Sequence, residues 1–156
     1  MFLTYLHRAA LVLLCTLFVA SCASTKATRG NIPARASRIL DVAESLQGTT
    51  YCAAGTTPEC FDCSGFVSYC FAEVGEILPR TSQAMYESGV AVDLRALQSC
   101  DVVFFRTNGT GISHVGIMID SERFIHSSTT RGVIVSPLID SYWAPRFVGA
   151  RRIIRH

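Results

Sequence analysis

The sequence has 156 residues, a formal net charge of +2 and hydrophobic residues at 49% of its positions. This length allows one ordinary domain with a core of its own. A charge so close to neutral does not indicate nucleic-acid binding or a role on an anionic surface, so we expect no nucleic-acid partner.

The first 21 residues are typical of an export signal. His7 and Arg8 form a short positive region, and the apolar run over residues 9–20 is too short to span a bilayer. Residues 17–21, Leu-Phe-Val-Ala-Ser, lead into Cys22 and resemble a bacterial lipoprotein signal. That resemblance implies cleavage before Cys22 and attachment of acyl chains such as palmitate. An ordinary secretory signal that happens to contain a cysteine is the alternative.

We predict three parts in this chain. Residues 1–21 form the signal peptide, residues 22–33 a flexible tether rich in Thr, Ser and Ala, and residues 34–156 one folded domain. We expect an exported monomer that the lipid anchors to the membrane of a bacterial cell envelope. Because Ala23 and not Asp follows Cys22, a Gram-negative host would hold the protein in its outer membrane, on the periplasmic side.

Five cysteines lie beyond Cys22, and an odd number leaves at least one thiol unpaired. An exported compartment is oxidising, so a thiol that stays free there is a candidate reactive group. Cys52 and Cys60 flank a short loop with Gly and Pro and are our first choice for a disulfide. A zinc site is the weaker alternative, because Cys60-x-x-Cys63 has no second pair at ligand spacing, and we expect no metal.

Helical spacing of apolar residues dominates the first half of the predicted domain. A stripe from Ile39 to Leu46 predicts a first helix that ends before Gly48. A second helix is expected over residues 63–74, ended by Gly75, and a short third one over residues 82–88. Residues 49–61 are expected to form a loop.

Strand patterns follow Gly89, without crossover helices between them. This order indicates an α+β fold in which N-terminal helices pack on one face of an antiparallel sheet. We expect the aromatic residues Tyr142, Trp143 and Phe147 to pack under the last strand. The five expected strands cover residues 102–105, 114–119, 123–127, 133–136 and 147–154.

Cys63 begins the second predicted helix, and His114 and His126 lie on neighbouring predicted strands. A nucleophile, a base and an orienting residue are arranged in this way in cysteine hydrolases. The helix N-terminus and a nearby imidazolium are expected to lower the pKa of Cys63, and Asp62 is a candidate N-cap. A three-residue turn at 120–122 would place the two histidines diagonally on one face, whereas a two-residue turn would place them on opposite faces.

Residues 61–67, Phe-Asp-Cys-Ser-Gly-Phe-Val, resemble the nucleophile motif of the NlpC-type, papain-like cysteine peptidases, which are mostly murein endopeptidases. The resemblance implies a papain-like α+β fold with a sheet of about five strands. It also implies catalysis by Cys63, His114 and His126 without a cofactor. Further matches follow in the family's order at residues 78–82, 101–105, 113–117 and 124–127.

The same resemblance implies the substrate, which is the bond between D-glutamate and a diamino acid in the stem peptides of peptidoglycan. Tyr51 matches the family's active-site tyrosine and is a candidate oxyanion donor. Ser64 is a further candidate for contact with the oxyanion or the substrate. The chain departs from the family at Ala54-Gly55, where two glycines are usual, and at Cys100, where glycine is usual and a disulfide would explain the cysteine.

Two other functions remain open at this stage. The same fold and nucleophile would also serve an amidase or an acyltransferase, with the Ala54-Gly55 region admitting another substrate. A non-catalytic lipoprotein that binds wall peptides in the same groove is the alternative from a different class of protein.

Overall fold

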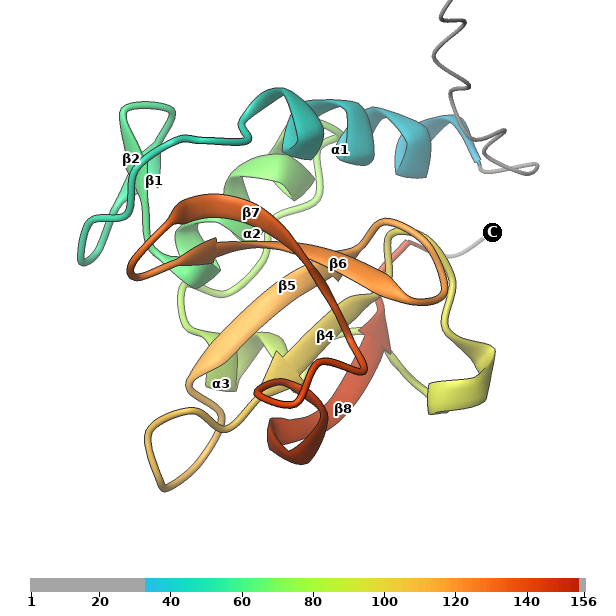
Figure 1. Ribbon diagram of the computed structural model, residues 1–156. Helices are drawn as coiled ribbons and strands as arrows, with labels where there is room; N and C mark the ends of the chain where they lie inside the picture. Colours follow the sequence, from blue (N-terminus) through green and yellow to red (C-terminus); the bar gives the residue numbers. More distant parts are fainter. Residues whose placement is uncertain (1–32, 155–156) are drawn as a thin grey trace, which may run out of the picture. The chain divides into compact units, whose positions relative to one another are not determined.

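The computed structural model describes residues 33–154 of the chain. The predicted signal peptide, the lipidation site at Cys22 and nearly all of the predicted tether therefore lie outside the described residues. Within residues 33–154, the helices are too short or too polar to cross a bilayer. Figure 1 shows helices on one side of a curved antiparallel sheet, as the sequence predicted for an α+β fold.

Apart from a short two-stranded ladder between the first two helices, the elements follow the predicted order of helices first and strands second. The helices are α1 (Ala34–Ser45), α2 (Cys63–Ala72) and α3 (Ser82–Met85), with 3-10 turns η1 (Leu94–Ala96) and η2 (Ala144–Arg146). A two-stranded ladder joins β1 (Thr56–Thr57) to β2 (Cys60–Phe61). The main sheet contains β3 (Val90–Val92), β4 (Val102–Phe105), β5 (His114–Met118), β6 (Arg123–Ser128), β7 (Gly132–Pro137) and β8 (Phe147–Arg152), in the order β3-β8-β4-β5-β6-β7.

The first two helices confirm the predicted apolar stripes, although both are shorter than expected at their C-terminal ends. Helix α1 buries Ile39, Leu40 and Ala43 on one face. Helix α2 buries Phe66 and Phe71 and stops before Gly75, whose φ of +77° suits a glycine after a helix. The third helix was predicted to reach residue 88, but α3 ends at Met85.

The hairpin between β5 and β6 has the register that a three-residue turn requires. Ile117 pairs with Ile125, and the Ile119 amide donates to the Arg123 carbonyl at 2.9 Å. Side chains alternate between the two faces of a strand, so this register puts His114 and His126 on the same face. Of the two turns that the sequence left open, the structure has the three-residue turn at residues 120–122.

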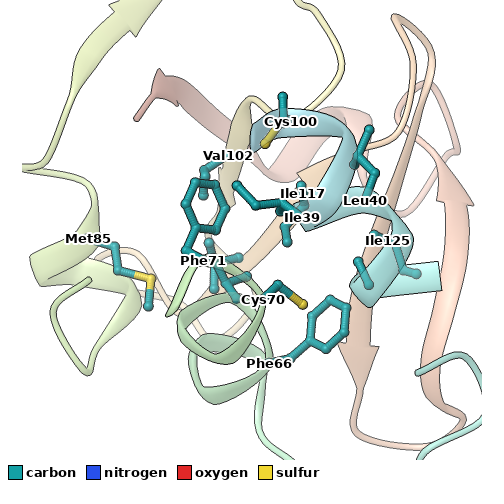
Figure 2. Close-up of a cluster of buried hydrophobic side chains, with 14 of the residues drawn as sticks. Ile39, Leu40, Phe66, Cys70, Phe71, Met85, Cys100, Val102, Ile117 and Ile125 are labelled. Carbon is teal, nitrogen blue, oxygen red and sulfur yellow. The ribbon is translucent and has the colours of Figure 1, made fainter. Parts of the chain in front are cut away.

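The sheet separates two apolar clusters. On the helix side, Ile117 and Ile125 pack with residues of α1 and α2, as Figure 2 shows. On the opposite side, Phe105 and Met118 pack with Phe124. The alternation within β5 places His114 with this second cluster, on the sheet face that points away from helices α1 and α2.

The expected count of about five strands missed the shortest ones. Strand β3 pairs with β8 through Val90 and Arg152, and the ladder of β1 and β2 lies inside the segment predicted as loop. Strands of two or three mostly exposed residues carry no alternating pattern that a sequence could reveal.

Two residues adopt left-handed backbone conformations that favour glycine, Ala54 with φ 60° and Cys100 with φ 72°. At both positions the resemblance described above implies a glycine. Cys100 is a buried free thiol whose amide donates to the Met118 carbonyl at 2.7 Å. The expectation that a disulfide explains Cys100 is therefore wrong, and the turn geometry before β4 explains the usual glycine.

Candidate active site

Cys63 is the first residue of α2, and Asp62 caps the helix by accepting from the Gly65 amide at 2.7 Å. The predicted N-cap is confirmed. The Cys63 thiol donates to the Ser113 carbonyl at 3.9 Å, and the Val115 amide also interacts with the sulfur. The sulfur therefore lies against the peptide groups on both sides of His114.

The electrostatics of Cys63 differ from the sequence-based expectation. Burial raises the pKa of the Cys63 thiol, and the negative charge of Asp62 raises it further. The amides of Ser64 and Val115 act in the opposite direction but do not prevail. The expected lowering of this pKa is wrong for the resting site, and Cys63 is a protonated thiol at neutral pH.

The two predicted histidines are in direct contact. His114 Nε2 and His126 Nδ1 are 2.9 Å apart, and His126 Nε2 lies 3.0 Å from Ser136 Oγ. In this row of hydrogen bonds, His114 contacts His126 through Nε2, and its other ring nitrogen, Nδ1, does not contact His126. Within the described part of the chain, no hydrogen bond joins the Cys63 sulfur to either ring.

Aromatic rings enclose the histidine pair. Trp143 stacks on His114 with centroids 5.0 Å apart and meets His126 edge-on at 4.8 Å. Phe124 stacks on His126 at 4.8 Å. Burial lowers the pKa of both histidines, so both are neutral at pH 7. Trp143 packs with Phe147 and the second cluster, near the last strand as expected, but its cover over the histidines was not predicted.

Tyr51 lies close to Cys63. The segment that carries it pairs with β2, where Tyr51 forms an isolated bridge to Phe61 and the Phe61 amide donates to the Thr50 carbonyl at 3.1 Å. Burial raises the pKa of Tyr51, and the charges of Cys63 and Asp62 raise it further. The charge of Cys63 therefore reaches the Tyr51 hydroxyl.

The Ser64 hydroxyl is already engaged in the cap of α2. It donates to Asp62 Oδ1 at 3.2 Å and accepts from Arg80 Nη1 at 2.9 Å. Arg80 also binds the Asp62 carboxylate through both of its Nη atoms, at 3.1 and 2.5 Å. Sequence reasoning assigned no role to Arg80, although it lies within the matched segment 78–82, because its partner Asp62 is 18 residues away.

The loop before α2 is closed by a disulfide between Cys52 and Cys60. This pairing confirms our first choice from the sequence. Cys63, Cys70 and Cys100 are free, and Cys70 and Cys100 are both buried. Residues 33–154 contain no group of three or more His, Cys, Asp and Glu side chains that could hold one metal ion.

A cavity of about 520 Å³ opens beside the histidines. His114, Ser136 and Trp143 form part of its wall, and Cys63 does not line it. The other walls come from the β6–β7 turn and from the segment before η2. The remaining lining residues are Thr107, Ser128, Thr129, Thr130, Arg131, Val135, Pro137, Asp140 and Tyr142.

A sequence model of the NlpC/P60 family matches residues 48–152. This match spans more than half of the chain, and the chain therefore belongs to the NlpC/P60 family. It includes the loop of Tyr51, all of α2 and every strand of the main sheet, so the residues described above lie inside the family domain.

Several relatives are similar over most of this chain. The chain is 41% identical over 119 residues to a murein DD-endopeptidase MepS/murein LD-carboxypeptidase of Escherichia coli K12. The matched segment covers 76% of this chain and 63% of that protein. A probable endopeptidase NlpC of the same strain is 37% identical over 155 residues, or 94% of this chain and 99% of that one. A gamma-DL-glutamyl hydrolase of Bacillus subtilis is 39% identical over 117 residues, 28% of its own length.

A solved structure confirms the fold assignment. An NlpC/P60 family protein from Bacillus cereus superimposes with a TM-score of 0.74 at 32% identity, over 77% of this chain and 40% of that one. The papain-like α+β fold expected from the motif at residues 61–67 is thus confirmed.

Proposed function

We propose that this chain is a cysteine endopeptidase of the bacterial cell wall that hydrolyses peptide bonds in peptidoglycan stems. The observation that carries the proposal is the 2.9 Å contact between His114 and His126, which lies beside a helix-borne thiol. Membership of the NlpC/P60 family supports the same chemistry, because the relatives described above are named as endopeptidases and hydrolases.

The histidine chain supports one tautomer of the base. For His114 to accept a proton at Nδ1, its Nε2–H must donate to His126 Nδ1, and His126 Nε2–H must then donate to Ser136 Oγ. His126 thereby fixes the orientation of the His114 ring, and Ser136 fixes the orientation of the His126 ring. A neutral His126 stabilises an imidazolium at His114 less than a carboxylate would, and it adds no charge to the buried site.

Hydrolysis then proceeds in two halves. The Cys63 sulfur attacks the scissile carbonyl carbon while its proton passes to His114 Nδ1. The tetrahedral intermediate collapses, the C–N bond breaks, and His114 gives the proton to the leaving amine. Water then attacks the thioester with His114 again as the base, which releases the carboxylate and restores the thiol. Because the resting thiol is protonated, the proton transfer accompanies the attack and does not precede it.

The oxyanion of each intermediate needs hydrogen-bond donors. The Cys63 backbone amide and the Tyr51 hydroxyl are the proposed donors, because Tyr51 lies close enough to Cys63 for their charges to interact. The Ser64 hydroxyl is occupied by Asp62 and Arg80, and this contact favours a role in the cap over one in the oxyanion site.

The proposed bond is the one between D-glutamate and the diamino acid of the stem. The similarity to a gamma-DL-glutamyl hydrolase supports it. Lipid attachment at Cys22 and residence at the cell-envelope membrane belong to the same proposal, and they rest on the signal-like sequence of residues 1–22.

The test is digestion of purified peptidoglycan by the purified chain, with mass spectrometry of the released fragments. We expect fragments cut within the stem peptide. Cys63→Ala should reduce their release by about 10³-fold or more, because the other free thiols of residues 33–154, Cys70 and Cys100, are buried in the core. The matched control is Cys70→Ala, which removes a free thiol that is buried in the core.

Other outcomes would support the alternatives. Release by Cys63→Ala at the wild-type rate would contradict the proposal. Fragments with uncut stems would favour an amidase or an acyltransferase, and retention of wall peptides without any product would favour the binding protein.

A further inference from the structure

The disulfide between Cys52 and Cys60 lies between the two proposed donors of the oxyanion site. Cys52 directly follows Tyr51, and Cys60 is three residues before Cys63. Tyr51 supplies the proposed hydroxyl donor and Cys63 the proposed backbone amide. The crosslink therefore joins the segment of one donor to the segment of the other.

The Tyr51 side chain is held mainly through the backbone of its own segment. The Cys52 amide donates to the Phe61 carbonyl at 3.2 Å, and the Phe61 amide donates to the Thr50 carbonyl at 3.1 Å. The side chain is only half-buried, and within residues 33–154 no hydrogen bond holds its hydroxyl. The place of this hydroxyl therefore depends on how firmly residues 50–52 are fixed.

The turn that follows Cys52 has a backbone conformation that its sequence does not favour. The Gly55 amide donates to the Cys52 carbonyl at 3.1 Å and closes a turn in which Ala54 has a φ of 60°. The third position of a turn with positive φ favours glycine, because the Cβ of any other residue is crowded there. The family resemblance also implies glycine at Ala54, so this turn requires support from another part of the chain.

The disulfide and the start of α2 supply that support. A side chain on Gly55 would collide with the Cys52 sulfur and the Cys60 carbonyl, so the turn packs directly on the crosslink. The Gly55 carbonyl accepts from the Asp62 amide at 3.0 Å, and a side chain on Gly65 would collide with the same oxygen. The turn is thus held between the disulfide on one side and the helix of the nucleophile on the other.

We propose that the Cys52–Cys60 disulfide is a positioning element of the oxyanion site. It keeps the turn at Ala54 in its left-handed conformation and thereby holds Tyr51 in place. A crosslink excludes other conformations of the loop, and an oxyanion donor lowers the barrier only if it is in place before charge develops. This inference rests on the proposed function, because it takes the Tyr51 hydroxyl as a donor to the oxyanion.

Kinetics of a disulfide-free chain test this role. Cys52→Ala with Cys60→Ala removes the crosslink without leaving an unpaired thiol. We expect kcat on a stem peptide to fall by about tenfold with little change in KM, because the donor is in place for only part of the time. In a Tyr51→Phe background the same replacement should change kcat by less than about twofold, because the hydroxyl is already absent. A tenfold loss in both backgrounds would overturn the proposal.

A rescue variant tests the part played by the turn. Ala54→Gly, added to the disulfide-free chain, should recover part of the lost kcat, because glycine adopts the left-handed conformation without the crosslink. The matched control is Ala53→Gly, at the neighbouring exposed alanine with negative φ, and it should recover nothing. Recovery by both variants or by neither would contradict the role of the turn. If the disulfide-free chain does not fold, the chain that also carries Ala54→Gly replaces it in the comparison with Tyr51→Phe.

Amide hydrogen exchange measures the same attachment without any reaction. In the disulfide-free chain, the amides at positions 52 and 61 should exchange about tenfold faster or more, while those of α2 keep their protection. Equal acceleration throughout the domain would show a general loss of stability, and unchanged exchange at positions 52 and 61 would show that the disulfide does not hold this segment. Either result would overturn the positioning role. Local acceleration in a chain whose wild type digests no wall peptide would instead overturn the proposed reaction.

Discussion

Cys63 and His114 are both uncharged in the resting site, and their pKa values are shifted in opposite directions. Burial raises the pKa of the thiol and lowers that of the imidazole to about 4. Both shifts act against a thiolate–imidazolium pair before substrate arrives. The amides at the start of α2 lower the pKa of Cys63, as the sequence suggested, but the Asp62 carboxylate beside them opposes their effect.

Tyr51 offers the sharpest single-residue test of the oxyanion site. Tyr51→Phe keeps the aromatic ring and removes one donor, so we expect kcat to fall by about 10²-fold with little change in KM. Steady-state kinetics on a stem peptide would measure the two constants. Tyr69→Phe, in α2, is the control and should keep the wild-type kcat. A rise in KM at constant kcat would assign Tyr51 to substrate binding instead.

At the start of α2, Asp62 affects both the stability of the helix and the pKa of Cys63. The Asp62 carboxylate caps the helix and binds Arg80, and the Ser64 hydroxyl bridges the two. Capping stabilises the helix that carries the nucleophile, while the same negative charge makes the nucleophile harder to ionise. The two effects of Asp62 can be separated by substitution.

Asp62→Ala should lower the free energy of unfolding by about 1 kcal/mol, the usual contribution of a helix cap. Asp62→Asn keeps a capping oxygen and should lose less. Both variants remove the negative charge, so the pKa of Cys63 should fall in both. Urea denaturation measures the first effect and the pH profile of thiol alkylation the second. An unchanged alkylation profile in both variants would show that Asp62 does not influence the thiol.

The sequence predicted the elements that bury a periodic face and missed those that do not. Helices α1 and α2 and strands β4 to β8 each present apolar residues to a core, and their positions follow from that pattern. Strand β3 is mostly exposed and exists because its backbone pairs with β8. The hydrogen bonds of such a strand are formed by a partner about 60 residues away, which a local pattern does not reveal.

The site as a whole combines residues from opposite sides of the sheet. The sulfur comes from a helix on one face, and the histidines, Trp143 and Ser136 lie on the other. Sequence spacing predicted Cys63, His114 and His126, because each belongs to a matched motif. Ser136 and Trp143 were not predicted as site residues, since only the folding of β7 and the following loop brings them to the histidines.

The buried histidines should make the stability of the whole molecule depend on pH. An unfolded histidine titrates near pH 6.5, whereas burial lowers the pKa of His114 to about 4 and also lowers that of His126. The unfolded chain therefore binds more protons below pH 6.5. Stability should be complete above that pH and fall by up to about 1.4 kcal/mol per pH unit for each histidine as the pH drops toward 4.

Urea midpoints measured between pH 7.5 and 5.0 would show this loss, because carboxylates with pKa values near 4 remain mostly ionised in that range. His126→Asn removes one of the two titrating rings, and its midpoint should vary less steeply with pH. A wild-type midpoint that is constant from pH 7 to 5 would contradict the buried, neutral state of the pair.

The disulfide between Cys52 and Cys60 protects the nucleophile Cys63 from forming a disulfide itself. Cys60 is only three residues from Cys63, and a free thiol there would be its nearest competitor for oxidation. Its bond to Cys52 occupies that sulfur, and the other two free thiols of residues 33–154, Cys70 and Cys100, are buried. Within this part of the chain, the fold thereby protects Cys63 from cross-linking, because each of the other sulfurs is already bonded or buried.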